Sequence, residues 1–327
     1  MIHFHETIWE EKEYNYEAAY GFIPSIHTYL HEDMEIRPCL LLIPGGGYCM
    51  VCNVEGEPVA DVFNEIGMNV IVLTYTTDIT MSIPLKTQPL MDASRAIRYI
   101  RKNSNRFKIN PDKITVMGFS AGGHLSASLS VHYNDIIDIN PTYNEISNKP
   151  NGTILGYPVI TSGEKTHPGS IISLIGHNPS EEELEYFSLE KHVTRNTPPC
   201  FCWQTVEDDL VPIENSMLYT SSLQENGIPH AFYAFPHGRH GLSVATERVK
   251  QNDFGEPYTF EQLEFVKKHI LDDTLINVSE QRKKELKEQF FPLKEQETEL
   301  PNPDDFYDDV AMWPYLAKEW LKSMELL

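Results

Sequence analysis

The segment GFSAG at residues 118–122 constrains the fold of this chain more than any other part of it. Residues 113–117 before it predict a short buried strand, and residues 123–129 after it predict a helix. A serine in this setting is typical of a nucleophile elbow, a sharp turn that exposes the hydroxyl of Ser120. The N–H groups at the start of the helix would favour negative charge on a nearby oxygen. The alternative is a glycine-rich turn whose serine only caps the helix.

Acidic and histidine residues follow in the chain order that such a serine requires. An apolar, strand-like run at 200–205 leads into a loop that holds Asp208 and Asp209, and a second run at 230–235 leads into a loop that holds His237 and His240. Open α/β sheets place their sites at the carboxyl ends of the strands. A general base and an orienting carboxylate are what a serine hydroxyl needs to become a nucleophile. The residues alone leave open which member of each pair acts.

Three consecutive glycines follow another strand-like run. Residues 39–43 read CLLLI and precede Pro44, the glycines at 45–47 and Tyr48. Glycines let the backbone approach a ligand and present N–H groups without side-chain obstruction. In α/β-hydrolases this position supplies part of the oxyanion hole. The alternative is a flexible glycine turn.

Strands alternate with helices along the chain. We expect strands within 22–43, at 68–73 and at 153–160, and helices at 57–66 and 84–106. This alternation predicts an α/β fold with a mostly parallel sheet and helices on both faces. A length of 327 residues suits one large domain, 1–327, with an insertion.

Composition narrows the classes of partner. The net charge of −22 argues against binding to nucleic acid or to anionic membranes, both of which need a positive field. The first residues lack the pattern of a signal peptide, and no apolar run is long enough to span a membrane. Five cysteines, an odd number, indicate reduced thiols and a cytoplasmic protein. Cys49 and Cys52 match C-x-x-C without a second pair at zinc spacing, so we expect no metal site.

Taken together, the motifs resemble those of the acetyl-esterase or xylan-esterase-like branch of the α/β-hydrolase superfamily, near the hormone-sensitive-lipase-like group. The resemblance spans most of residues 25–245 and the last fifteen or so. The matching stretches are PGGGY at 44–48, EGEPVA at 55–60, residues 118–124, DDLVPIENS at 208–216, GRHGL at 238–242, WPYLA at 313–317 and WL at 320–321.

The resemblance selects between the neighbouring candidates. The acid of the family stands four residues before the proline of a Val-Pro pair, which is Asp208 here, and its base directly precedes a glycine, which is His240. Asp209 is then a solvated loop charge and His237 a residue of the rim. His124, which follows the elbow, is expected to be a packed core histidine.

The resemblance also implies a reaction and a class of substrate. Ser120 would attack a short acyl ester, typically an acetyl group on a sugar such as a xylo-oligosaccharide, and form an acyl-enzyme without cofactor or metal. Backbone N–H groups of Gly46, Gly47 and Ala121 would form the oxyanion hole. The aromatic side chains of Tyr48 and Trp203 would offer a surface to a sugar, or else pack in the core.

Two segments fall outside the core pattern. Residues 161–195 are expected to form a short, partial cap of loops and small helices, with a capping box at residues 180–183. Residues 250–310 form an acidic insertion that the family lacks, with a capping box at Thr259 and Gln262 and a second helix at 279–290. The insertion would decorate the surface, shape the rim of the pocket or make a contact in a homo-oligomer.

Three rival functions remain at this level. The same catalytic set serves amide hydrolysis, as in peptidases or arylformamidases. A long-chain lipase would need a larger apolar lid than residues 161–195 provide. A non-catalytic scaffold would retain the fold without turnover.

Overall fold

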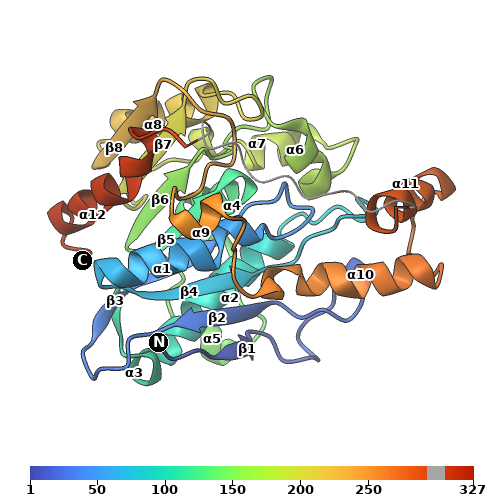
Figure 1. The fold of residues 1–327 in the computed structure, drawn as a ribbon, viewed down its shortest axis with the longest axis horizontal. Helices are drawn as coiled ribbons and strands as arrows, with labels where there is room; N and C mark the ends of the chain where they lie inside the picture. The colour runs from blue at the N-terminus through green and yellow to red at the C-terminus, as the bar shows by residue number, and fades with distance from the viewer. Residues whose placement is uncertain (293–305) are drawn as a thin grey trace.

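The central sheet follows from the alternation of strands and helices. In the computed structural model, which describes residues 1–292 and 306–327, eight strands form one sheet in the order β1-β2-β4-β3-β5-β6-β7-β8 (Figure 1). All pairs from β4 to β8 in that order are parallel, and β1 and β2 add two antiparallel pairings at one edge. This confirms the prediction of a mostly parallel sheet. The strands are β1 (His5–Thr7), β2 (Ser25–Tyr29), β3 (Arg37–Ile43), β4 (Asn69–Thr74), β5 (Ile109–Phe119), β6 (Gly152–Gly156), β7 (Cys200–Thr205) and β8 (His230–Phe235).

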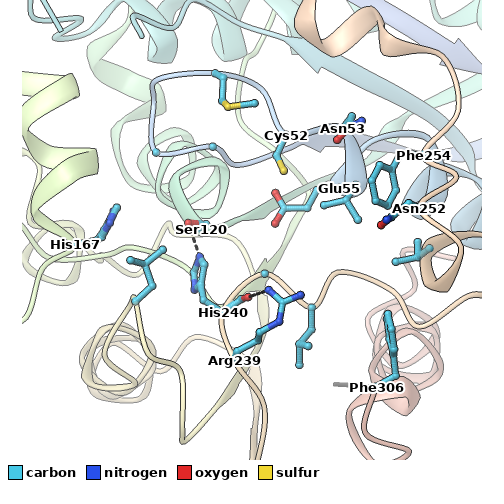
Figure 2. Close-up of a pocket in the computed structure, with 18 residues that line it drawn as sticks. Cys52, Asn53, Glu55, Ser120, His167, Arg239, His240, Asn252, Phe254 and Phe306 are labelled. Atoms are coloured by element: carbon cyan, nitrogen blue, oxygen red, sulfur yellow. Dashed lines mark hydrogen bonds between the residues drawn. The ribbon is translucent and has the colours of Figure 1, made fainter. Parts of the chain in front are cut away.

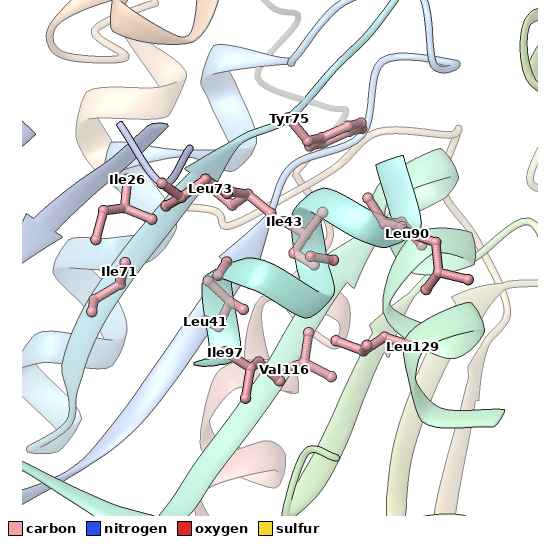
Figure 3. Packing of buried hydrophobic residues seen from close by; sticks show 14 of the residues in the cluster. Ile26, Leu41, Ile43, Ile71, Leu73, Tyr75, Leu90, Ile97, Val116 and Leu129 are labelled. Carbon is pink, nitrogen blue, oxygen red and sulfur yellow. The ribbon is translucent and has the colours of Figure 1, made fainter. Parts of the chain in front are cut away.

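Helices cover both faces of the sheet, because successive side chains of a strand point to opposite sides. Leu41 of β3 faces α2 and α4, where it packs in a cluster with Ile97 and Leu129 (Figure 3). Leu40 faces the other way, into a cluster with residues of α1 and α12. The α-helices are α1 (Glu57–Ile66), α2 (Gln88–Lys102), α3 (Ser104–Phe107), α4 (Ser120–His132), α5 (Pro141–Asn144), α6 (Pro168–Ile175), α7 (Glu181–Tyr186), α8 (Glu214–Glu225), α9 (Glu247–Lys250), α10 (Glu261–Leu271), α11 (Glu280–Phe290) and α12 (Trp313–Ser323).

Strand register brings the predicted loops together in two pairs. Ile43 at the end of β3 pairs with Gly118 near the end of β5, so the glycine loop and the elbow start side by side. Thr205 at the end of β7 pairs with Phe235 at the end of β8, so the acid loop and the histidine loop also start side by side. All four loops therefore leave the sheet at its carboxyl edge.

Some element boundaries differ from expectation. The strand predicted at 153–160 ends at Gly156, because Tyr157 takes a positive φ of 36° and Pro158 cannot donate to a ladder. The helix predicted at 84–106 is divided into α2 and α3. β1 is three residues long and was not predicted.

The cap and the insertion contain the expected short helices. Ser180 and Glu183 form the predicted capping box of α7. The capping box predicted at Thr259 is wrong: Phe260 is the N-cap residue of α10, and the side chain of Gln262 bonds with Thr77 instead. Residues 293–305 of the insertion lie outside the described residues.

The described helices of the insertion pack on the rest of the chain. Figure 1 shows α10 and α11 together on the side of the molecule opposite to α12. Val266 and Ile270 of α10 and Leu286 of α11 form a small buried cluster with Ile79. Their apolar faces are thus covered within the chain. No helix in residues 1–292 and 306–327 combines the length and the apolar character needed to cross a membrane.

Candidate active site

The elbow places Ser120 in a strained turn between β5 and α4. Its φ is 50°, in the left-handed region that non-glycine residues rarely occupy. A Cβ on Gly122 would lie 2.1 Å from the carbonyl oxygen of Ile43, so only glycine allows the helix to start this close to β3. Ser120 is 6% exposed and lines a cavity.

Hydrogen bonds join the serine, the histidine and the acid that were predicted to act together. Ser120 Oγ lies 2.9 Å from His240 Nε2, and His240 Nδ1 lies 2.8 Å from one carboxylate oxygen of Asp208 (Figure 2 shows the first of these bonds). Because a carboxylate only accepts, Nδ1 carries the proton of the neutral ring. The lone pair of Nε2 therefore faces the serine O–H, as a general base requires.

The two adjacent aspartates have different partners. The side chain of Asp208 is fully buried, and its carboxylate also accepts the N–H groups of Leu210 and Val211. Asp209 is exposed, as predicted for a solvated charge, yet it accepts the backbone N–H of His240 at 3.1 Å. That bond lowers the pKa of Asp209. Asp208 thus bonds with the imidazole ring of His240, and Asp209 bonds with the backbone N–H of the same residue.

The other two histidines considered from the sequence lie outside this set. His237 is exposed and its Nδ1 is 3.1 Å from Glu207. His124 is fully buried: its Nδ1 lies 2.8 Å from the hydroxyl of Tyr48 and its Nε2 lies 3.1 Å from the carbonyl oxygen of Phe187. Burial lowers the pKa of His124 to about 4. The prediction of a core histidine is confirmed.

The glycine loop presents its backbone to the cavity beside Ser120. Gly46 and Gly47 take positive φ angles of 120° and 64°, and both line the cavity. Within residues 1–292 and 306–327, no group accepts a hydrogen bond from the N–H of either glycine. These N–H groups can therefore serve a substrate oxygen.

Glu55, the first residue of the matching stretch at 55–60, links the glycine loop to the histidine loop, a role that the sequence did not predict. Its carboxylate accepts the N–H of Gly45 at 2.6 Å and the hydroxyl of Tyr157 at 2.7 Å. Tyr157 in turn accepts the N–H of Ser243, and its ring lies edge-on to that of His240 at 4.8 Å. Burial raises the pKa of Glu55, which is 3% exposed. The sequence placed Glu55 in a matching stretch before a helix, but it did not show which groups the carboxylate would bond with.

A cavity of about 560 Å³ surrounds these groups. Its wall is mostly apolar, and the insertion supplies two aromatic rings, Phe254 and Phe306 (Figure 2). It is lined by Gly46, Gly47, Met50, Cys52, Asn53, Val54, Glu55, Ser120, His167, Leu210, Arg239, His240, Gly241, Leu242, Val249, Asn252, Phe254 and Phe306.

The aromatic residues expected to meet a sugar are not at this wall. Tyr48 is 1% exposed and bonded to His124, and Trp203 is fully buried with its ring stacked on that of Trp313. Both belong to the core, which corrects the expectation that they offer a binding surface. The sequence could not distinguish these two roles. Tyr48 follows β3 and Trp203 lies in β7, and both strands lead into loops of the site.

The described part of the chain contains no group of three or more metal-ligating side chains, and its five cysteines are unpaired thiols. Burial raises the pKa of Cys52, which lines the cavity.

Comparisons with known proteins show which family this chain is similar to. The BD-FAE family model matches residues 26–223. The chain is 56% identical over 259 residues to endo-1,4-beta-xylanase B of Butyrivibrio fibrisolvens, and 31% identical over 210 residues to an acetylxylan esterase of Xylanibacter ruminicola. These matches cover 79% and 62% of the chain, but only 41% of each relative.

A solved structure matches over nearly its whole length. The acetyl ester-xyloside bifunctional hydrolase of Caldicellulosiruptor lactoaceticus is 34% identical, with a TM-score of 0.70, and the match covers 80% of this chain and 96% of that one. Another structure, an α/β-hydrolase from a deep-sea metagenome, is 30% identical with a TM-score of 0.57 over 84% of this chain and 98% of its own. The fold is thus that of the α/β-hydrolases.

Proposed function

Since the chain belongs to the BD-FAE family, we propose that it is a serine carboxylesterase that removes acetyl groups from sugars or xylo-oligosaccharides. The observation that carries this proposal is the hydrogen-bond chain from Ser120 through His240 to Asp208. It lies in a cavity lined by Gly46 and Gly47, whose N–H groups have no acceptor among residues 1–292 and 306–327.

Acylation begins when Ser120 Oγ attacks the ester carbonyl. His240 Nε2 takes the serine proton, and the buried carboxylate of Asp208 stabilises the imidazolium that forms. Negative charge then develops on the former carbonyl oxygen, where the N–H groups of Gly46, Gly47 and Ala121 can donate to it. Loss of one such donor typically costs about 10²–10³ in rate. His240 returns its proton to the departing alcohol.

Deacylation repeats the same steps with water. His240 deprotonates a water molecule that attacks the acyl-enzyme, and Ser120 leaves with the proton. The acid product and the free enzyme are released. The proton transfers in both halves are supported by the hydrogen bonds of His240 with Ser120 and with Asp208.

The names of two relatives support the choice of substrate class. One is an acetylxylan esterase and the other an acetyl ester-xyloside bifunctional hydrolase. The cavity wall suits a sugar, because it combines the amide side chain of Asn53 with apolar side chains and aromatic rings. An acetyl group needs little of this space, so the larger part of the cavity is available to the alcohol.

The test combines a serine-directed probe with a substrate panel. The wild-type chain is expected to bind a fluorophosphonate covalently and to release acetate from acetylated xylo-oligosaccharides. Ser120→Ala should lose the label and reduce turnover by at least about 10³-fold. Ser221→Ala, an exposed serine on α8, is the matched control and should keep the label.

The panel also separates the rival functions. Hydrolysis of an acetanilide faster than p-nitrophenyl acetate would replace the esterase with an amide hydrolase. Absence of both the label and any turnover in the wild-type chain would leave a non-catalytic scaffold.

A further inference from the structure

His167 is the one residue of the cap segment 161–195 that lines the cavity among the described residues. It directly precedes α6, and its ring reaches the cavity beside Ser120, at the end opposite to Phe306 (Figure 2). In the sequence, nothing around His167 and Pro168 predicted a role in the site.

The start of α6 fixes the tautomer of this histidine. The backbone N–H of Ser170 donates to His167 Nδ1 at 3.3 Å, and the Ser170 hydroxyl lies 2.8 Å from the same nitrogen. A nitrogen that accepts from a backbone N–H carries no hydrogen itself, so the proton of the neutral ring is on Nε2. Burial lowers the pKa of His167, and the nearby His240 lowers it further, which keeps the ring neutral.

The N–H at Nε2 is available to a bound molecule. In residues 1–292 and 306–327, no protein group forms a hydrogen bond with this atom, whereas Nδ1 is held by Ser170. The other lining residues, including the glycine loop, Asn53 and Arg239, come from segments outside the cap. His167 therefore adds a single directional donor from the cap side.

We propose that His167 is a specificity-determining residue whose Nε2–H donates a hydrogen bond to a hydroxyl in the alcohol part of the substrate, next to the esterified position. This inference rests on the proposed function. An acetyl group has no acceptor besides the ester oxygens, and the glycine loop already serves the carbonyl oxygen. The alkoxy oxygen of the ester is the one that His240 protonates as the alcohol departs. The oxygens that remain for the His167 donor are the free hydroxyls of a polyol such as a sugar.

The experiment compares two esters that share the acetyl group, ethyl acetate and 2-hydroxyethyl acetate. The second carries a hydroxyl next to the ester oxygen. The readout is the ratio of kcat/KM for the hydroxylated ester to that for the plain ester. His167→Asn should keep the cap, because asparagine is a good N-cap acceptor, but its shorter amide cannot reach the substrate. Loss of one neutral hydrogen bond should lower the ratio about three- to tenfold.

Two further variants make the result specific. His167→Gln places an amide N–H about as far from the backbone as Nε2 and should restore part of the ratio. His177→Asn, an exposed histidine just beyond the end of α6, is the matched control and should leave the ratio at its wild-type value.

The outcomes that overturn the proposal are distinct from failure of the proposed function. An unchanged ratio in His167→Asn would show that the donor does not meet the alcohol. Ethyl glycolate carries its hydroxyl on the acyl part. If His167→Asn lowers the ratio of kcat/KM for ethyl glycolate to that for ethyl acetate instead, His167 contacts the acyl side. If the wild-type chain hydrolyses none of these esters, the proposed function itself fails, and this inference fails with it.

Discussion

Residues of one type take different roles in this molecule according to the atoms that face them. The ring of His240 receives a buried carboxylate on one nitrogen and a serine hydroxyl on the other. His124 has both nitrogens bonded in the core, and His167 has one nitrogen held by a helix start. The ability to act as a base, a structural link or a donor thus follows from local hydrogen bonds rather than from residue type.

The first prediction at this scale concerns the two adjacent aspartates. Asp208→Asn should lower kcat by about 10³-fold or more, because an amide no longer fixes the proton on Nδ1 of His240 or stabilises the imidazolium. Asp209→Asn should change kcat less than about tenfold, since Asp209 bonds with the backbone N–H of His240 and not with its ring. The measurement is steady-state hydrolysis of p-nitrophenyl acetate. A larger loss in Asp209→Asn would reverse the assignment of the acid.

The second prediction concerns Glu55. Glu55→Ala removes the acceptor for both Gly45 and Tyr157, so the glycine loop should lose its position and kcat should fall about 10²-fold, the cost of a weakened oxyanion donor. Glu55→Gln retains an acceptor for Gly45 and should lose less. Glu65→Ala, an exposed residue of α1, is the control. Equal kinetics in the alanine variant and the wild type, with both folded by circular dichroism, would remove Glu55 from the site.

The third prediction concerns pH and His124. Its pKa is about 4 in the folded chain and 6.5 in the reference state, so the unfolded chain binds more protons between these values. The free energy of unfolding should therefore fall as the pH drops from 6.5 towards 4. The contribution of this residue is on the order of 3 kcal/mol.

Comparison with His124→Gln isolates this contribution. Glutamine can keep both hydrogen bonds and has no charge to gain. In urea titrations at pH 7.5 and 4.5, the stability of the wild type should fall relative to that of the variant. Parallel changes in both proteins would assign the pH dependence to other groups.

For helices and strands, local sequence patterns predicted the bounds of elements in or on the sheet. They did not predict the roles of side chains that bond with residues far along the chain. The apolar run at 200–205 and the helix at 57–66 match β7 and α1 to the residue, because burial on regular faces leaves a period in the sequence. The loop carrying Ser120 could be predicted from its glycines. The roles of Glu55, Tyr157 and Gln262 could not, since each depends on a partner far along the chain.

A prediction at this scale tests how α10 is attached. The side chain of Gln262 accepts the N–H of Thr77 at 2.9 Å, and both residues are buried. Gln262→Met keeps the volume but leaves the polar groups of Thr77 unpaired, which should cost about 1–3 kcal/mol. Gln281→Met on α11 removes only an exposed bond to Glu285 and should change stability by less than about 0.5 kcal/mol. Urea unfolding measures both, and equal values would show that α10 is not held through this amide.

At the scale of the whole molecule, the cavity is assembled from segments far apart in the chain. The glycine loop, the elbow, the cap and both ends of the insertion each contribute to its wall. The cap contributes only His167, so no large apolar lid covers the serine in the described residues. On the proposed function, we therefore expect small acyl groups, with the remaining space taken by the alcohol.

The corresponding prediction is a preference for short acyl chains. Acetyl and propionyl esters of p-nitrophenol should give the highest kcat/KM, with activity falling beyond about six carbons. The fall should be graded, because one methylene in an apolar pocket is worth only about 1–3 kcal/mol. A maximum at eight or more carbons would indicate a lipase-like pocket instead.

The left-handed conformation of Ser120 has a consequence for how such a chain can change over time. A non-glycine residue at this φ costs on the order of 1–2 kcal/mol, which glycine would avoid. The most stable sequence for this backbone therefore differs from the reactive one at the very position where the hydroxyl is needed. A lineage that lost the need for the reaction would gain stability by giving up the serine, so retention of serine here requires selection for chemistry rather than for folding.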